Sequence, residues 1–333
     1  MKVSIIMTSY NYGRFIEEAV ASVLRQTHSD FELIIIDDGS TDDTPDRVKL
    51  FTDPRICSVR TVNQGVAAAR NAGLDRATGA IVAGLDADDR WLPTMLERQV
   101  GLFETEPEVV ASFTNFLRFD DTGKVRQKDQ FTFYPELKTF PSRSARCGYG
   151  KVLLGDSFQH FLTAADSPGF TTAIAYRRDA VLTLRYNRDR AIWPVEDMQY
   201  MFSAFLLGAV AYNEEPLAEL RRHGGNATAN RLLIPRGKLR AFELLAEESL
   251  TPAQRGVLVS RTVRSRFEVA RAHTRMGDLR GCAGTIIDAF RKPGSLSLKI
   301  RGAAGVVRWT IGNYRRQRLK RARQGLPTRP APH

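Results

Sequence analysis

Cysteines and long hydrophobic runs are scarce in this sequence of 333 residues. The three cysteines, at positions 57, 147 and 282, are far apart and match no zinc-binding spacing. An odd number of distant cysteines argues against a disulfide framework and indicates a reducing compartment. The longest apolar stretch, near residues 201–212, is well short of the roughly 18–20 residues of a membrane span. The first residues carry one lysine and too short an apolar run for a signal peptide, so we expect a cytoplasmic protein.

The sequence also lacks two phosphate-binding motifs. No G-x-G-x-x-G follows the first apolar run, and no G-x-x-x-x-G-K-[ST] occurs anywhere. Both absences disfavour a dinucleotide-binding fold and a P-loop NTPase. A chain that handles phosphates without these loops needs another means of holding them, and a metal ion bound by carboxylates is one.

Acidic residues are missing from the end of the chain. Residues 289–333 hold 12 of the 49 Lys and Arg and none of the 37 Asp and Glu, so the first 288 residues carry 37 of each sign. The whole net charge of +12 therefore lies in this tail. A basic amphipathic stretch suits an anionic membrane surface. Nucleic acid is a competing partner that no recognition motif supports, and a merely solvated tail is the third interpretation.

Four short apolar runs alternate with helical patterns in the first ninety residues, which predicts an α/β protein with a parallel, doubly wound sheet. The predicted strands are Val3–Met7, Phe31–Ile36, Ile56–Val62 and Ile81–Leu85. The predicted helices cover residues 15–26, a segment from Thr44, and residues 66–77.

Carboxylates follow two of these strands, at Asp37-Asp38 and at Asp86, Asp88 and Asp89. Right-handed crossovers bring the ends of parallel strands to one sheet edge, where open α/β sheets bind ligands. Two carboxylates two residues apart can share a hard divalent cation with water and phosphates. The alternative is that Asp86 caps a helix and its neighbours are solvated surface acids.

The rest of the chain gives coarser signals. Strands are predicted at residues 109–119 and 170–176, with a hairpin turn at 120–123 and an irregular region at 126–168. Glu196 and Asp197 open a helix whose apolar part covers residues 200–209. Further helices are predicted at residues 238–248, 251–276, 278–290 and 298–318, and the Pro-rich end from 325 is predicted to be disordered.

Four segments resemble the nucleotide-binding half of the family-2 glycosyltransferases, which have the GT-A fold. They are VSIIMTSYN, SVLRQTHSDFELIIIDDGSTDDT, AAARNAGLDRATG and LDADDRW, in the family's order and spacing across the first hundred residues. The resemblance implies a mostly parallel sheet flanked by helices, with a helical C-terminal extension. It implies a nucleotide-sugar-binding half (1–115), an acceptor-binding and catalytic half (116–235), a helical extension (236–290) and a basic amphipathic or disordered tail (291–333).

The resemblance also implies roles for single residues. The nucleotide would be bound by Thr8, Tyr10, Asp37, Asp38, Arg70 and Asp86. The metal, Mn²⁺ or Mg²⁺, would be bound by Asp88 with Asp86 and His223. The general base would be Asp197, with Glu196 as the alternative. Structural roles compete with four of these assignments. They are a half-buried core tyrosine for Tyr10, a solvated helix cation for Arg70, a structural histidine for His223 and, for Asp197, an acid that complements the dipole at the start of a helix.

The function implied is an inverting transfer of a sugar from a nucleoside-diphosphate sugar to an acceptor hydroxyl. The acceptor would be a glycan or a lipid-linked molecule of cell-surface polysaccharide or glycoconjugate synthesis, and the enzyme could lie peripherally on the inner face of the plasma membrane. Uridine is favoured as the base, while thymidine and guanosine stay open. The chain departs from the family at Leu184-Arg185-Tyr186-Asn187, where Gly-Gly-Phe-Asp is usual. A nucleotide- or glycan-binding protein without transferase activity is the alternative, and a sugar-1-phosphate nucleotidyltransferase is disfavoured by the single glycine in TSYNYGRF.

Overall fold

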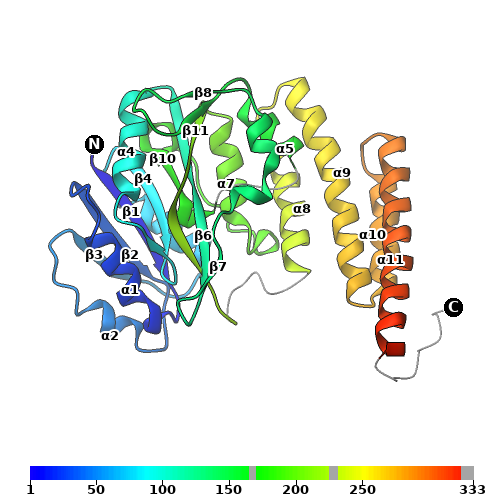
Figure 1. Cartoon of the computed structure of the whole chain (residues 1–333), viewed down its shortest axis with the longest axis horizontal. Coiled ribbons are helices and arrows are strands. Elements are labelled where there is room, and N and C mark those ends of the chain that lie inside the picture. Colours follow the sequence, from blue (N-terminus) through cyan, green and yellow to red (C-terminus); the bar gives the residue numbers. More distant parts are fainter. Residues whose placement is uncertain (165–169, 225–231, 324–333) are drawn as a thin grey trace. The chain divides into compact units, whose positions relative to one another are not determined.

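The chain folds into two compact units, residues 1–229 and 230–333. The computed structural model describes residues 1–164, 170–224 and 232–323. The first unit is built around one mixed sheet with helices on its faces, and the second is helical (Figure 1). Within the described residues, no helix combines the length and the apolar character needed to cross a bilayer. The predicted disordered end from residue 325 lies outside the described residues, and the finer predicted division at 115, 235 and 290 stays a prediction.

The four predicted N-terminal strands are present and parallel, in the spatial order β3-β2-β1-β4. Their bounds are β1 Val3–Ser9, β2 Phe31–Asp37, β3 Ile56–Arg60 and β4 Ile81–Asp86. In register, Thr8 lies opposite both Ile36 and Asp86, and Ser9 lies opposite Asp37. The two acidic clusters therefore share one sheet edge, as the sequence predicted.

Helices cover both faces of this half-sheet because side chains along each strand alternate between faces. The bounds are α1 Gly13–Leu24, α2 Thr44–Val48, α3 Val66–Leu74 and α4 Met95–Thr105, of which α4 had not been predicted. Ile5 and Met7 of β1 join the main core with residues of α1 and α4. Ile6 faces α3, where a Cβ on Gly73 would lie 2.3 Å from its Cγ2 atom. By the same alternation, Thr8 lies on the α3 face.

The second half of the sheet is mixed rather than parallel. Its strands are β5 Arg90–Trp91, β6 Val109–Asp120, β7 Val125–Gln127, β8 Ser142–Ser144, β9 Lys151–Leu153, β10 Ile174–Arg177 and β11 Ala209–Arg222. Strand β10 runs antiparallel between β4 and β6, whereas the long β11 runs parallel to β6. The predicted hairpin turn is present, since β7 returns antiparallel along β6.

Three predictions for this half need correction. Residues 126–168 are less irregular than predicted, because they hold β8, β9, the 3₁₀ turns Phe131–Phe133 and Pro135–Thr139, and α5 Ser157–Thr163. The predicted strand at 170–176 begins with the 3₁₀ turn Thr171–Ala173, and β10 follows it. The helix predicted to end at residue 209 is α7 Glu196–Phe205, since Ala209 already starts β11. The short α6 Arg178–Val181 and the 3₁₀ turn Arg190–Ile192 connect β10 to α7.

The second unit contains the four predicted helices, within a few residues of the expected bounds. They are α8 Leu233–Leu245, α9 Pro252–Arg275, α10 Leu279–Arg291 and α11 Leu296–Arg323. Thr251 and Gln254 form a capping box at the start of α9, and Asp278 caps α10 through the Gly281 N–H. Val263 and Phe267 of α9 pack with residues of α10 and α11 in a small core.

Glu32 of β2 connects parts of the first unit through hydrogen bonds whose strength depends on pH. Although burial acts to raise the pKa of this carboxyl, hydrogen bonds from Ser4, Thr78 and Lys2 lower it to about 2. A lowered acid pKa stabilises the fold above the unfolded-state value near 4.5, and this stabilisation disappears as the pH falls toward 2. We expect wild type to exceed Glu32→Gln in urea-unfolding stability at pH 6, with a gap that shrinks below pH 4.5. A gap that does not change between pH 6 and pH 3 would contradict this assignment.

Candidate active site

The loop after β1 is fixed to the loop after β2 by Asn11. This residue has a left-handed backbone (φ 59°), its N–H donates to Ser40 Oγ (2.9 Å), and its Oδ1 accepts from the Thr41 N–H (2.8 Å). Asparagine tolerates this conformation better than most residues. The neighbouring Tyr10 is 45% exposed, so its ring is open to a ligand and is not a core side chain.

The carboxylates of Asp37 and Asp38 are buried and accept hydrogen bonds from backbone N–H groups of the neighbouring loops. Asp37 Oδ1 accepts from the Ser40 N–H at 2.9 Å. Asp38 accepts from the N–H groups of Gln64 (2.9 Å) and Gly65 (2.8 Å), which fixes the start of α3. Both acids thus fix the loops at the sheet edge beside Thr8, which is itself buried. Whether they also bind a base stays a prediction.

Arg70 of α3 connects the two halves of the first unit. Its Nη2 donates to Asp86 Oδ1 at the end of β4 (3.0 Å), and its Nη1 donates to Glu196 Oε1 at the start of α7 (2.6 Å). The guanidinium is buried, with 7% of the side chain exposed, and lies over the ring of Tyr186 at 5.4 Å. Arg70 is therefore not a solvated helix cation, because it holds two predicted site acids in one place.

Burial shapes the charge balance around this ion pair. It raises the pKa of Asp86, an effect that Arg70 opposes and Asp88 strengthens. It likewise raises the pKa of Glu196, again against the pull of Arg70. For Arg70, burial alone would lower the pKa, but Asp86 and Glu196 outweigh it and the pKa is raised. The arginine therefore stays charged between the two carboxyl groups.

Asp88 lies against His223, whose Nε2 is 3.0 Å from Asp88 Oδ2. The histidine side chain is 2% exposed, and its ring packs against Tyr12 and Phe15 at centroid distances of 6.1 and 5.0 Å. The structure therefore brings together two residues that lie 135 positions apart and that the sequence assigned to one metal site. Burial, followed by the charges of Asp88 and Asp86, raises the pKa of the Tyr12 hydroxyl.

Asp89 and Arg221 fix the loop that carries Asp88. Asp89 accepts from Thr172 Oγ1 (2.6 Å) and from the Arg221 N–H (2.8 Å). The Arg221 guanidinium donates through Nε to the Asp88 carbonyl (2.9 Å) and through Nη2 to Glu18. Burial and the neighbouring Asp88 and Asp86 raise the pKa of Asp89 well above its usual range. Strand β11 and helix α1 thus hold the acidic loop from two sides.

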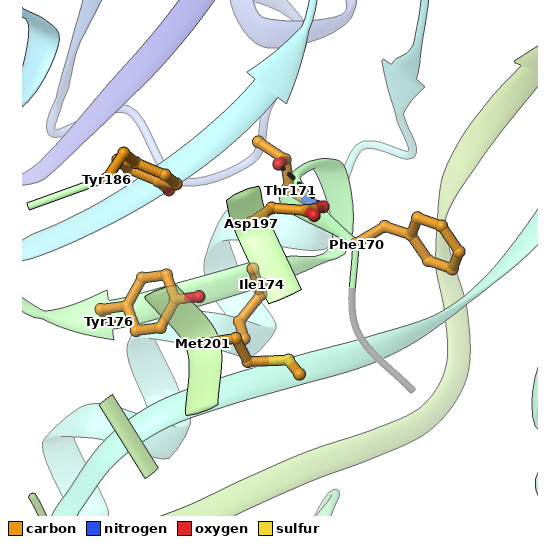
Figure 2. A pocket seen from close by; sticks show the side chains of 7 residues that line it. All are labelled: Phe170, Thr171, Ile174, Tyr176, Tyr186, Asp197 and Met201. Atoms are coloured by element: carbon orange, nitrogen blue, oxygen red, sulfur yellow. Dashed lines mark hydrogen bonds between the residues drawn. The ribbon is translucent and has the colours of Figure 1, made fainter. Parts of the chain in front are cut away.

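Asp197 lies at the edge of a narrow cavity, shown in Figure 2. Its Oδ2 accepts long hydrogen bonds from the N–H and Oγ1 of Thr171 (3.4 and 3.3 Å), and its Oδ1 accepts from the Met198 N–H (2.8 Å). The cavity is otherwise lined by Phe170, Ile174, Tyr176, Tyr186 and Met201. Asp197 is partly exposed whereas Glu196 is buried and paired, so Asp197 is the more accessible acid of the two.

The acidic edge suits a divalent cation in its chemistry. Asp86, Asp88 and Asp89 follow one another within four residues, and burial together with mutual repulsion raises the pKa of Asp86 and Asp89. A cation would relieve that repulsion, and carboxylate oxygens are suitable ligands. No three acidic, histidine or cysteine side chains in the described ranges converge closely enough to hold an ion alone. Protein ligands would therefore have to be completed by water or phosphate oxygens.

Several site residues escaped the sequence analysis. Tyr12, Thr171 and Thr172 contact or flank the acids, and each belongs to a loop or a 3₁₀ turn far from them in sequence. The turn at 171–173 is accommodated by Gly84, because a Cβ there would lie 2.5 Å from Thr171 Cγ2. Gly84 interrupts an otherwise apolar strand, and it was the one local sequence signal that another segment of the chain approaches β4 closely.

An Arg70→Gln substitution tests the ion pair. Removing Arg70 leaves the buried Glu196 uncompensated, so we expect a loss of about 3–5 kcal/mol in unfolding free energy. Asp86 adds little to this loss, because its side chain is 36% exposed and water screens its charge. Chemical denaturation would measure it, with the exposed Arg76→Gln as the matched control. A second change, Glu196→Gln in the same chain, should recover part of the loss. Equal stability of Arg70→Gln and Arg76→Gln would refute the bridging role.

Comparison with known proteins gives consistent matches. The family model described as glycosyl transferase family 2 matches residues 4–181. An uncharacterized glycosyltransferase of Nostoc sp. is 35% identical over 68% of this chain and 66% of its own length. A UDP-Glc:α-D-GlcNAc-diphosphoundecaprenol β-1,3-glucosyltransferase of Escherichia coli is 43% identical over 34% of this chain and 45% of its own length. The chain thus spans less than two thirds of either relative.

Two solved structures share the fold. Residues 1–349 of S. aureus TarS, in complex with UDP-GlcNAc, superpose with a TM-score of 0.59 at 15% identity, covering 99% of this chain and 93% of that one. A mannosyltransferase of Pyrobaculum calidifontis, in complex with GDP-Man and Mn²⁺, gives a TM-score of 0.59 at 19% identity, covering 93% and 83%. At these identities the likeness shows the fold alone, which is the predicted GT-A architecture of a mostly parallel sheet flanked by helices.

Proposed function

The chain belongs to glycosyl transferase family 2, and we propose that it transfers a sugar from a nucleoside-diphosphate sugar to an acceptor hydroxyl with inversion. The observation that supports this most is the Arg70 bridge. It joins Asp86, at the ligand-binding edge of the parallel strands, to Glu196, at the start of the helix that carries Asp197. This contact supports a donor site that lies next to a proton acceptor for the second substrate.

The nucleotide would bind along the ends of β1 and β2. The exposed ring of Tyr10 offers a face on which a base can stack. Asp37 and Asp38 set the loop geometry, and their remaining lone pairs can accept N–H donors from a base edge. Thr8 would line the same pocket. Uridine is the preferred base in this proposal, in agreement with the UDP-sugar named for the Escherichia coli relative.

The donor diphosphate would lie over Asp88. A Mn²⁺ or Mg²⁺ ion bound there, with Asp86 and His223 beside it, would supply positive charge that stabilises the leaving diphosphate. The contact between His223 Nε2 and Asp88 orients the carboxylate, while Arg221 fixes the backbone beneath it. Contacts that position charged groups before the donor binds would favour selective stabilisation of developing charge.

Asp197 would act as the general base. Its partial exposure and weak Thr171 contacts leave Oδ2 able to accept a proton from an acceptor hydroxyl. As the proton moves to Asp197, the acceptor oxygen bonds to the anomeric carbon, and the bond from that carbon to the diphosphate oxygen breaks. Attack opposite the leaving group in this single displacement inverts the anomeric configuration.

The acceptor in this proposal is a glycan or a lipid-linked saccharide of cell-surface polysaccharide synthesis. The Escherichia coli relative is named for a diphosphoundecaprenol-linked acceptor. A cytoplasmic enzyme peripheral to the inner face of the plasma membrane would meet such acceptors, with the basic residues 291–333 contributing to contact. The alternative is a nucleotide- or glycan-binding protein without transferase activity. Such a protein would need the binding pocket but no accessible Asp197.

Nucleoside-diphosphate release distinguishes the two functions. The full chain would be incubated with UDP-, dTDP- and GDP-sugars and Mn²⁺, with and without a lipid-linked saccharide, and free diphosphate would be measured. We expect release from one donor class, faster with acceptor, and a product of inverted anomeric configuration by NMR. A product of retained configuration would refute the single displacement, and tight donor binding without release would favour the binding protein.

A further inference from the structure

The second unit exposes apolar residues in two regular rows. On α10 the row is Leu279, Ala283, Ile287 and Phe290, and on α11 it is Leu296, Ile300, Ala304, Val307 and Ile311. Steps of three and four residues place each row on one face of its helix. The large side chains in these rows are 39% to 63% exposed. We call the two rows the apolar stripes.

The opposite faces of both helices pack against α9. Cys282 and Ala289 of α10 and Val306 of α11 pack in the core with Val263 and Phe267 of α9. Gly302 allows this close packing, because a Cβ there would lie 2.3 Å from Phe267 Cδ2. The apolar stripes therefore point away from α9, and within the described residues of this unit no helix covers them.

Cations flank the stripes and acids are nearly absent. Exposed basic side chains on or between the two helices are Arg280, Arg291, Lys292, Arg301 and Arg308. Arg301 and Arg308 each follow a stripe residue directly, which puts them about 100° around the helix from it. Asp288 is the single acid of α10 and α11, and it pairs with Arg266 at 3.4 Å.

We propose that the apolar stripes of α10 and α11 bind an anionic lipid bilayer, with their side chains in the headgroup–acyl boundary and the flanking cations on lipid phosphates. Helices that lie in a membrane interface have this combination of a broad apolar face and basic flanks. A second copy of the chain fits less well, because two such faces would bring like charges together. Nucleic acid fits less well too, because phosphate binding needs cations but no apolar stripe. The proposal rests on the membrane contact of the proposed function and deepens it, because it places that contact on two folded helices that begin at Leu279.

Vesicle co-sedimentation of the full chain tests this proposal. Wild type should bind phosphatidylglycerol-containing vesicles and not pure phosphatidylcholine vesicles.

An apolar variant replaces stripe residues (Ile287→Gln, Ile300→Gln, Val307→Gln, Ile311→Gln). A cation variant neutralises the flanks (Arg291→Gln, Lys292→Gln, Arg301→Gln, Arg308→Gln). Each should lower partitioning at least about tenfold, because a cation near an anionic surface contributes up to about fivefold and buried apolar side chains add to that. The matched control replaces exposed apolar residues of the first unit (Leu50→Gln, Val125→Gln, Leu182→Gln, Leu207→Gln) and should bind like wild type.

Three outcomes would overturn the proposal. Wild type failing to bind anionic vesicles would exclude a bilayer partner. If the apolar variant bound vesicles as tightly as wild type, binding would be purely electrostatic and the apolar stripes would not enter the bilayer. Sedimentation velocity that finds a dimer dissociated by the apolar variant, without vesicle binding, would assign the face to a second copy. Circular dichroism of both variants controls for loss of the helices, and the substituted residues are exposed, so the fold should persist.

Discussion

An Asp88→Asn variant is expected to lose turnover by on the order of 10²–10³-fold, together with metal-dependent nucleotide binding. Asparagine keeps the size of the side chain and can still meet His223, whose Nε2 lies 3.0 Å from the carboxylate. What it removes is the negative charge, and a neutral amide oxygen is a poorer ligand for a hard cation than a carboxylate. Steady-state kinetics across a Mn²⁺ titration, with nucleotide affinity measured in parallel, would show the loss.

The matched control for this variant is Asp121→Asn, an exposed turn acid of the first unit. It makes the same chemical change away from the site and should leave both turnover and nucleotide binding unchanged. Wild-type turnover by Asp88→Asn would contradict the role of Asp88 in holding a cation. Lost turnover with unchanged Mn²⁺ dependence of nucleotide binding would contradict it as well.

The Asp197→Asn variant should separate binding from chemistry. We expect nucleotide affinity close to wild type and a loss of turnover of on the order of 10²–10⁴-fold, the typical contribution of a positioned general base. The reason is that Asp197 lies on α7, beside Thr171 and the cavity, and is no part of the Asp88–His223 contact. Single-turnover kinetics with saturating donor would measure the chemical step.

Glu196→Gln provides the comparison for Asp197→Asn. Glu196 is buried and bonded to Arg70, so its loss should lower unfolding stability as well as activity. Asp197→Asn should leave stability nearly unchanged, because its Oδ1 contact is to the N–H of the next residue. Turnover retained in Asp197→Asn but lost in Glu196→Gln, at equal stability, would transfer the base assignment to Glu196.

The sheet edge could be predicted because its signals are local. β1, β2 and β4 are short apolar runs that end in polar residues, and parallel strands put such ends together. The register bears this out, with Thr8 opposite Asp86 and Ser9 opposite Asp37. The start of α7 at Glu196 was also predictable, since two acids complement the N-terminal end of a helix.

The connections across the site could not be predicted from local patterns. Arg70 and Glu196 are 126 residues apart, and nothing in the Ala-rich segment around Arg70 distinguishes a buried cation from a solvated one. The 3₁₀ turn at Thr171–Ala173 was predicted as strand because Phe170, Thr171 and Thr172 have high strand propensity. Tertiary contacts from Thr171 to Asp197 and from Thr172 to Asp89 replace the strand pairing there.

The most direct test of the account is calorimetric titration of UDP, dTDP and GDP into the full chain, each with and without Mn²⁺. We expect one nucleotide, with UDP favoured, to bind in a Mn²⁺-dependent manner, and we expect this binding to be lost in Asp88→Asn and kept in Asp197→Asn. Failure of all three nucleotides to bind under either condition would contradict the proposal that the edge of β1, β2 and β4 is a nucleotide-sugar site.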